Sequence, residues 1–309
     1  MKYLVFDITN MLHRTFFAQR NEDDETIAGL ATHSALVTLN KYFKQHKPHK
    51  VVMAFDRSSW RKEYTASEEC LSKKPYKGNR RQDMTPAQEA KYQRFLGHLA
   101  EFESLIIEHT TIMTLVAQKL EADDLIAGFC QVYADDDNEI VIISSDSDLL
   151  QLTQYPNVRV ISPATDKEQS LEDYDGDPLY YVFQKCVRGD PTDNVQSAFP
   201  RVKSTKIREA YDNEYAYTNL MNETWVIKDP ETGEAAITYR VGDLFKENQK
   251  LIDLAKQPAD IRRLILETVD EASNTSKQFS MFYILKFLGK YKLNKIKEGM
   301  DQYIPLLSR

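Results

Sequence analysis

Residue types that define several common protein classes are scarce in this 309-residue chain. It has three cysteines, Cys70, Cys130 and Cys186, far apart and without a CxxC pair, which argues against a disulfide scaffold or a cysteine-rich zinc site. No apolar run approaches the length of a membrane span, and no signal peptide is apparent. We therefore expect a protein of the reducing cytoplasm without a membrane partner.

A positive net charge is also missing. The chain has 40 Lys and Arg against 47 Asp and Glu, a formal net charge of −7. This total weakens the case for a nucleic-acid partner but does not exclude one, because local clusters of basic residues can still bind phosphates. An apolar content of 42% is ordinary for a globular protein, and the length allows one large domain or two.

Basic residues are concentrated between Arg57 and Arg81. Eight Lys or Arg lie in this segment, with Trp60, Tyr64 and Tyr76 among them. Such a mixture can neutralise phosphates and stack on unpaired bases. A solvated run of charges is the alternative, and composition alone does not decide between them. Because residues 57–85 combine like charge with few aliphatic side chains, we expect this segment to be mobile without substrate.

Acidic residues follow four short apolar runs that predict buried strands: 2–8, 50–56, 112–117 and 140–143. Taken alone, each acid is explained by a helix cap or a solvated strand end. Parallel strands, however, present their carboxyl ends at one edge of a sheet, where ligands gather. The acids expected at this edge are Asp7, Asp56, Glu121, Asp123, Asp124, Asp146 and Asp148.

Carboxylates crowded in this way repel one another, and a bound cation is the usual remedy. Oxygen ligands without a neighbouring His or Cys favour Mg²⁺ or Mn²⁺ over zinc. The prediction is an α/β fold with a mostly parallel central sheet, helices on both faces, and a carboxylate-rich metal site at one edge.

Outside these strands, the pattern predicts a long helix from Pro86 to about His109 and a hairpin over 225–239. Helical spacing occupies 241–270 and 277–307, which predicts a helical subdomain. In this subdomain we expect four aromatic side chains to belong to the core: Phe279, Phe282, Tyr283 and Phe287.

The order of short motifs resembles the 5′-nuclease superfamily, which includes flap endonucleases and the 5′→3′ exonuclease domains of bacterial DNA polymerases. These motifs are FDxxN, a strand ending in Asp56, YKGNR, EADD, SSDSDLLQL and RGDPTDN. The run IISSDxDxxQLxxYPNVxxxSP over 142–163 is most similar to the ribonuclease H of T-even bacteriophages. The resemblance covers residues 2 to about 194 and is weaker beyond.

This resemblance implies roles for individual residues. Asp7, Asp56, Glu121 and Asp123, with Asp124 beside them, resemble the ligands of a first metal ion. Asp146, Asp148, Asp190 and Asp193 resemble those of a second. Lys77 and Arg80 match catalytic basic residues of an arch, and Tyr76 and Arg81 would position the substrate. Arg14 would contact phosphate, and duplex contacts would come from Arg201, Lys203 and Lys206.

It also implies two Mg²⁺ ions, replaceable by Mn²⁺, and hydrolysis of DNA and of RNA primers annealed to DNA. The substrates would carry a 5′ flap, a nick or a 3′-recessed junction, as in removal of lagging-strand primers of a phage. The protein would act as a monomer in the cytoplasm of the infected bacterium, beside single-strand-binding or other replication-fork proteins. The expected domains are a nuclease core, 1–185, with the arch at 57–85, and a DNA-binding helical part, 186–309.

One departure from the family and several rival classes are relevant. No glycine follows Gly189 in the segment 188–210, where the family has a glycine-rich hairpin, so a monovalent-cation site there is left open. Lys203 and Lys206 are equally explained as surface charge. A PIN-domain ribonuclease would lack YKGNR and RGDPTDN, a haloacid-dehalogenase-like phosphatase would need an acid at Thr9, and a catalytically weak DNA-binding protein would have lost acids.

Overall fold

The computed structural model describes residues 1–309 except 19–21, 81, 83, 136 and 229–234. The chain divides into two compact units. Unit A comprises Met1–Ser58, Asp83–Gln169 and Arg263–Arg309, and unit B comprises Ser59–Gln82 and Ser170–Arg262. Each unit is built from separate stretches of the chain. The basic segment after Ser58 belongs to unit B, and the last helices belong to unit A.

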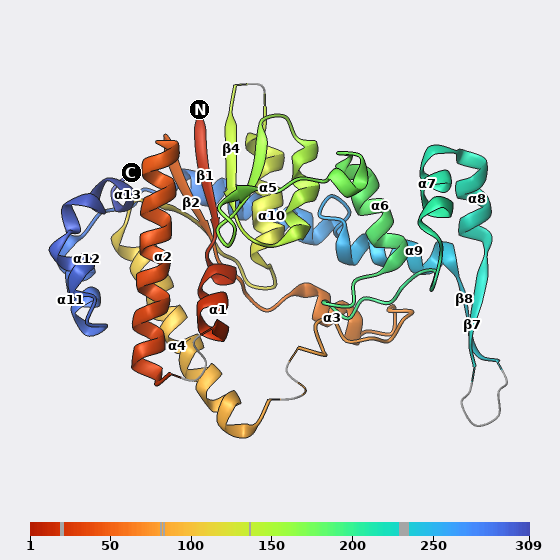
Figure 1. Ribbon diagram of the computed structural model, residues 1–309, viewed down its shortest axis with the longest axis horizontal. Helices are drawn as coiled ribbons and strands as arrows, with labels where there is room; N and C mark the ends of the chain where they lie inside the picture. Colours follow the sequence, from red (N-terminus) through yellow and green to blue (C-terminus); the bar gives the residue numbers. More distant parts are fainter. Residues whose placement is uncertain (19–21, 81, 83, 136, 229–234) are drawn as a thin grey trace. The chain divides into compact units, whose positions relative to one another are not determined.

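Unit A is built on a six-stranded sheet of order β3-β2-β1-β4-β5-β6 (Figure 1). Strands β1 to β5 pair in parallel, and β6 pairs antiparallel with β5. The predicted mostly parallel α/β sheet is therefore confirmed. The strands are β1 (Lys2–Asp7), β2 (Lys50–Ala54), β3 (Met113–Leu115), β4 (Glu139–Ile143), β5 (Val158–Ser162) and β6 (Lys167–Glu168).

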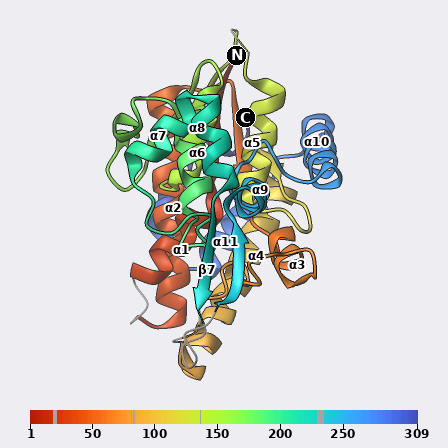
Figure 2. The same ribbon diagram turned by 90° about the vertical axis from the view of Figure 1, so that its right-hand side faces the viewer.

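Helices cover both faces of this sheet. One face carries α1 (Ile8–Ala18), α2 (Asp24–His46) and α4 (Pro86–His109), and the other carries α5 (Ala122–Tyr133), beside which α10 (Ala259–Asn274) lies (Figures 1 and 2). No helix in the described ranges is both long and apolar enough to cross a membrane. The remaining helices of the unit are η1 (Ser147–Gln154), α11 (Met281–Lys290), α12 (Asn294–Glu298), η3 (Met300–Gln302) and α13 (Ile304–Leu307).

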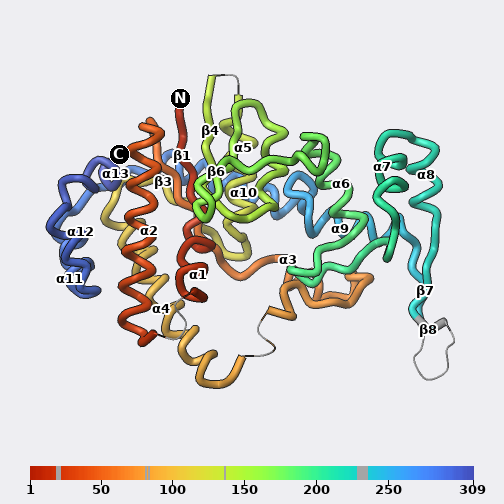
Figure 3. The backbone as a smooth tube through the Cα atoms, in the orientation of Figure 1, coloured from red at the N-terminus to blue at the C-terminus, as the bar shows by residue number. Residues whose placement is uncertain are grey.

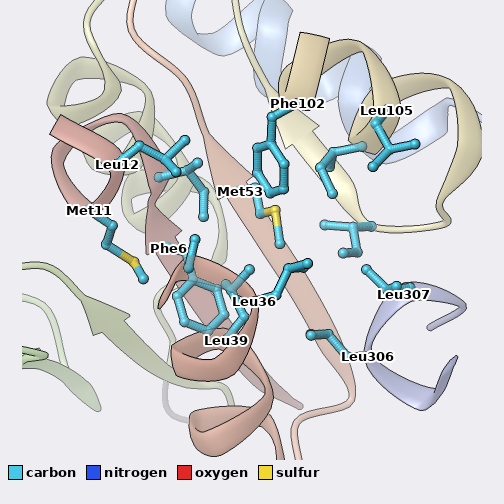
Figure 4. Packing of buried hydrophobic residues seen from close by; sticks show 14 of the residues in the cluster. Phe6, Met11, Leu12, Leu36, Leu39, Met53, Phe102, Leu105, Leu306 and Leu307 are labelled. Atoms are coloured by element: carbon cyan, nitrogen blue, oxygen red, sulfur yellow. The ribbon is translucent and has the colours of Figure 1, made fainter. Parts of the chain in front are cut away.

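The central strands are buried on both faces, as their unbroken apolar sequences predict. In β1, Leu4 and Phe6 enter the main core together with residues of α2, α4 and α13 (Figure 4). Tyr3 points the other way, and the centroid of its ring lies 5.3 Å from the ring centroid of Phe129 in α5. The sheet is therefore held from both sides, and its strand ends are placed by the packing of its middle.

The long helix α4 has the bounds that the sequence predicts. Thr85 caps it in a capping box with Gln88, and Pro86 occupies the first turn, where its missing N–H removes no helical hydrogen bond. The segment after β4 also turns helical, but as the 3₁₀ helix η1, with Asp146 as its N-cap.

The expectation for the C-terminal aromatics is partly wrong. Phe287 is buried and Phe279 packs against the core, whereas Phe282 is 69% and Tyr283 45% exposed. Helix α11 buries Ile284, Phe287 and Leu288, and this i, i+3, i+4 stripe places residues 282 and 283 outside the buried face.

Unit B is helical, with one hairpin (Figure 3). The predicted hairpin is confirmed in strands β7 (Thr224–Lys228) and β8 (Ala235–Arg240), while its loop, 229–234, lies outside the described residues. The indole N–H of Trp225 donates to the carbonyl of Ala198 (2.8 Å) and attaches β7 to the preceding loop. The helices are α3 (Trp60–Ala66), η2 (Glu172–Tyr174), α6 (Pro178–Arg188), α7 (Ser204–Asp212), α8 (Glu214–Asn222) and α9 (Val241–Ile252).

The basic segment makes specific contacts with the rest of unit B. Arg61 is buried, and its Nε donates to the carbonyl of Leu251 (2.8 Å). The carboxylate of Glu247, in α9, accepts from the backbone N–H groups of Leu71 and Ser72. Trp60 is also buried. Sequence composition missed this because the anchoring residues lie almost 200 positions away.

The contact between α5 and α10 gives a test of the fold. A Cβ on Gly128 would lie 2.1 Å from Cγ2 of Ile265, while a Cβ on Gly97 in α4 would meet nothing within 4 Å. We expect Gly128→Ala to lower the free energy of unfolding by about 1–3 kcal/mol through overpacking. Gly97→Ala should raise it by about 0.5–1 kcal/mol through helix propensity. Urea unfolding of both variants measures this; shifts of the same sign would contradict the packing.

Candidate functional site

Three acids of unit A lie at the carboxyl edge of adjacent parallel strands. Asp7 is the last residue of β1, Asp56 follows β2, and Asp146 follows β4. In the register, Asp7 is opposite Ala54, and Phe6 is opposite Ile143. Strand β1 is flanked by β2 on one side and β4 on the other, so the chain order reverses there. Such switch points are where open α/β sheets bind ligands.

The environment of Asp7 is unfavourable for a negative charge. Its side chain is 5% exposed, and it accepts from the N–H of Asn10 (3.1 Å) and the hydroxyl of Ser144 (3.0 Å). Burial, followed by the negative charges of Asp56 and Asp146, raises the pKa of Asp7 to about 8, although both hydrogen bonds act in the opposite direction. The strand edge therefore holds carboxylates close enough to repel one another.

A second acidic group lies at the start of α5. Carboxylate oxygens of Glu121, Asp123 and Asp124 all lie within 4.8 Å of one another. Asp56 is tied to this group because its Oδ1 accepts from the N–H of Ala122 (2.7 Å). The first turn of a helix offers backbone N–H groups and a favourable dipole to such acids, which helps to explain how Glu121 and Asp124 can be buried there.

The residues of this edge fit a hard divalent cation. The donors are carboxylate oxygens, the ligands that Mg²⁺ and Mn²⁺ prefer. The side-chain oxygen of Asn10, next to Asp7, is buried and has no hydrogen-bond partner among the described residues. A cation here would reduce the repulsion on Asp7, and its hydration water could satisfy such a buried oxygen.

The loop after β4 combines capping with site geometry. The N–H of Asp146 donates to the hydroxyl oxygen of Ser144 (3.1 Å), which itself donates to Asp7. Oδ1 of Asp146 accepts from the N–H of Asp148 (2.9 Å) and so caps η1. The cap that was the simpler explanation for Asp146 is therefore present, and it fixes the carboxylate beside Asp7.

Arg14 lies near the same loop, on α1. Its guanidinium donates to the hydroxyl of Ser145, and its side chain is otherwise exposed. It borders a hollow of about 320 Å³ whose other lining residues are Met11, Thr15, Ala18, Ser34, Thr38 and Pro163.

Unit B carries the other two acids predicted from RGDPTDN, in the loop after α6. Asp190 is paired with Lys185 (2.8 Å) and accepts from Thr192. Burial alone would raise its pKa, but the Lys185 ammonium and the hydrogen bonds from Thr192 lower it to about 2. Sequence reasoning missed Lys185; its position in the last turn of α6, just before RGD, was the available signal.

The basic residues of YKGNR surround the second of these acids. Asp193 accepts from the hydroxyl of Tyr76 (2.7 Å) and from Arg80 (2.5 Å), and the ammonium of Lys77 lies 3.7 Å from its Oδ2. Tyr76 is 4% exposed, so its ring offers no open face for a base in this structure. Arg81 lies outside the described residues.

The three residues predicted to grip a duplex lie between α6 and α7 or within α7. Arg201 and Lys203 are exposed, while Lys206 pairs with Glu223. Arg201 has a φ of +59° and Asn194 one of +60°. Two non-glycine residues therefore take the left-handed conformations that glycine would favour in this segment.

Comparison with known proteins gives these sites a context. Residues 2–180 match the family described as "5'-3' exonuclease, N-terminal resolvase-like domain". Ribonuclease H of Enterobacteria phage T4 is 26% identical over 260 residues, covering 82% of this chain and 79% of the relative. The 5'-3' exonuclease of Aquifex aeolicus is 25% identical over 316 residues, 90% of this chain and 98% of the relative. DNA polymerase I of Streptococcus pneumoniae is 27% identical over 208 residues, but the match spans only 22% of that protein.

Solved structures agree on the fold. The T5 D15 protein crystallised with metal ions superposes with a TM-score of 0.63 at 18% identity, covering 89% of this chain and all of that one. The T5 D15 flap endonuclease in complex with DNA and metal ions gives 0.62 at 20% identity, with the same coverage. Because the family match covers more than half of the sequence, the chain belongs to the 5′–3′ exonuclease family of the 5′-nuclease superfamily.

Proposed function

We propose that the protein is a divalent-metal-dependent 5′-nuclease that hydrolyses DNA, and RNA primers annealed to DNA, from 5′ ends and at 5′ flaps. The observation that carries this proposal is the buried carboxylate of Asp7 between Asp56 and Asp146, at the switch point of a parallel sheet. The similarity to phage T4 ribonuclease H supports a role in removing primers during phage replication.

The cofactor we propose is Mg²⁺, as two ions, with Mn²⁺ able to replace it. Asp7, Asp56, Glu121, Asp123 and Asp124 would hold one ion. Asp146 and Asp148 belong to the same sheet edge and would also bind metal, and we propose Asp190 and Asp193 of unit B as further metal ligands. When bound, such ions lower the pKa of a water and stabilise charge on a phosphodiester.

Other residues would orient the metal ligands or bind phosphate groups of the substrate. Ser144 orients both Asp7 and Asp146 through its hydroxyl. Lys77 and Arg80 would stabilise negative charge developing on the scissile phosphate, as pre-positioned cations do. Arg14, Arg201, Lys203 and Lys206 would neutralise phosphates away from the reacting bond.

The partners follow from this activity. The substrate is DNA with a 5′ flap, nick or 3′-recessed junction, or an RNA–DNA hybrid, and the protein acts as a monomer in the host cytoplasm beside other replication-fork proteins. End-labelled nicked, flapped and RNA-primed duplexes, each incubated with Mg²⁺ and with EDTA, test the substrate range. The rival, a DNA-binding protein with weak catalysis, would bind all three and cleave none.

Metal binding to the apo protein is testable without substrate. We expect Mg²⁺ or Mn²⁺ to raise the melting temperature, because a ligand that binds the folded state stabilises it. Asp7→Asn should raise the metal-free melting temperature by about 2–4 °C, since it removes a repelled carboxylate, and should reduce the metal-induced rise. Differential scanning calorimetry measures both. Asp243→Asn, at an exposed position of α9, is the control; an Asp7→Asn protein with a normal metal response would contradict the assignment.

Removal of the Asp146 charge should strongly reduce turnover. Asp146→Asn keeps a cap for η1 but weakens the metal site, so we expect kcat to fall by about 10–100-fold or more. Single-turnover cleavage of a flapped duplex over a range of Mg²⁺ concentrations measures the loss. Full activity of the wild-type protein in EDTA would refute metal dependence.

Binding and chemistry should separate within unit B. Asp190→Asn with Asp193→Asn should impair cleavage but leave duplex affinity unchanged or tighter, because a negative charge near phosphate is removed. Lys203→Ala with Lys206→Ala should weaken binding and reduce the slope of log K against log salt by about one to two units. Gel-shift titration at several salt concentrations distinguishes them, with Lys246→Ala plus Lys256→Ala as the matched control. The same response from both pairs would contradict this division.

A further inference from the structure

Two turns of unit B are joined by hydrogen bonds that no assigned role explains. The first, residues 75–80, is called the basic turn, and the second, residues 190–195, the acidic loop. The side-chain amide of Asn79 donates to the carbonyl of Pro191 (2.9 Å), and that of Asn194 donates to the carbonyl of Pro75 (2.9 Å). Between them, the N–H of Lys77 donates to the carbonyl of Asp193 (2.8 Å). The amide bonds are reciprocal: each turn supplies one amide and one proline carbonyl.

The ion pairs at Asp193 depend on this arrangement. Lys77 and Arg80 come from the basic turn, and Asp193 belongs to the acidic loop. The three bridging bonds use side-chain amides and backbone groups, and none uses the Asp193 carboxylate. The two turns can therefore stay joined while that carboxylate changes its partner.

Local sequence supports a built connection. A Cβ on Gly78 would lie 2.7 Å from Cγ of Pro75 and 2.9 Å from its carbonyl oxygen, and a Cβ on Gly189 would lie 2.6 Å from the carbonyl oxygen of Val195. Lys77 and Asn194 both have positive φ, 55° and 60°, and asparagine tolerates this region better than most residues. The backbone conformation of each turn therefore requires a glycine at or beside it and a residue with positive φ within it.

We propose that Asn79 and Asn194 are positioning residues: their crossed amide bonds lock the basic turn to the acidic loop and so hold Lys77 and Arg80 beside Asp193. This inference rests on the proposed function for its catalytic consequence. In the resting state the Asp193 carboxylate pairs with both cations. A divalent cation that binds Asp193 and a phosphate that binds Lys77 and Arg80 replace these ion pairs. The amide bonds of Asn79 and Asn194 meanwhile keep the three charged side chains close together.

The lock can be measured without substrate or metal. Tryptic cuts after Lys77, which lies inside the basic turn, require this turn to open. Loss of one bridging hydrogen bond should increase the initial rate of these cuts by about fivefold. The variants are Asn79→Ala, at an exposed side chain, and Asn194→Gly, which keeps the positive φ. Mass spectrometry of the early peptides assigns each cut.

Three controls separate the lock from general loosening. Asn219→Ala, exposed on α8, and Asn157→Gly, at a left-handed asparagine of unit A, repeat the same chemical changes elsewhere and should leave the cuts unchanged. Asp193→Asn removes the ion pairs but not the amide bonds, and its carboxamide oxygen can still accept from the Tyr76 hydroxyl, so its rates should rise less than those of Asn79→Ala. Melting temperatures exclude global unfolding. If Asp193→Asn opens the turn as much as Asn79→Ala, or if neither asparagine variant opens it, the proposal is wrong.

Activity then tests the consequence. In Asn79→Ala we expect kcat on a flapped duplex to fall about tenfold with little change in KM, because misplaced cations lose contact in the transition state. Duplex affinity in Ca²⁺ should be unchanged. A wild-type protein without nuclease activity would refute the proposed function but leave the proteolysis result valid. An active Asn79→Ala enzyme with normal kcat and fast tryptic cuts would refute the positioning role alone.

Discussion

The repulsion between carboxylates at the buried edge of the sheet is the constraint on which the rest of unit A depends. A charged group as buried as Asp7 is costly unless something compensates it, and here two neighbouring acids add to the cost. The fold tolerates this free-energy cost because strands β1, β2 and β4 are packed on both faces, and this packing keeps them together. Ser144 and the N–H of Asn10 orient the carboxylate but do not neutralise it. The stability of the hydrophobic sheet thus maintains an electrostatic arrangement that the apo protein disfavours, as is common at functional sites.

Much of unit A could be predicted from sequence because its signals are local. Unbroken apolar runs gave β1, β2 and β4, and Thr85, Pro86 and Gln88 gave the start of α4. The acids after these strands were visible for the same reason. The topology that makes them neighbours, with β1 between β2 and β4, is not encoded in any single motif; it creates a switch point, where open α/β sheets bind ligands.

The parts that could not be predicted depend on contacts between distant residues. Trp60 and Tyr76 read as base-stacking residues because aromatics among lysines and arginines have this composition, yet both are buried. The segment is held by Leu251 and Glu247, and the Tyr76 hydroxyl by Asp193, all of which are far away in the sequence and are connected to it by no local pattern. Phe282 and Tyr283 show the opposite error, because they were expected in the core and are exposed. Their helix has one buried stripe, and these two residues lie outside it. In each case the sequence shows that the side chain is aromatic, but it does not show whether the folded chain buries or exposes that side chain.

Asp7 and Asp190 show how one residue type is adapted to two tasks. Both are buried, and burial alone would raise both pKa values. At Asp7 the nearby charges are negative, so the pKa rises to about 8; at Asp190 the ammonium of Lys185 and Thr192 reverse the effect, and the pKa falls to about 2. Both acids of the acidic loop are therefore paired with cationic side chains of the protein itself. Lys185 of α6 pairs with Asp190, and Lys77 and Arg80 of the basic turn pair with Asp193. Around Asp7, by contrast, the neighbouring charges that act on its pKa are those of Asp56 and Asp146, and both are negative. Burial therefore acts together with the local charges at Asp7 and against them at Asp190.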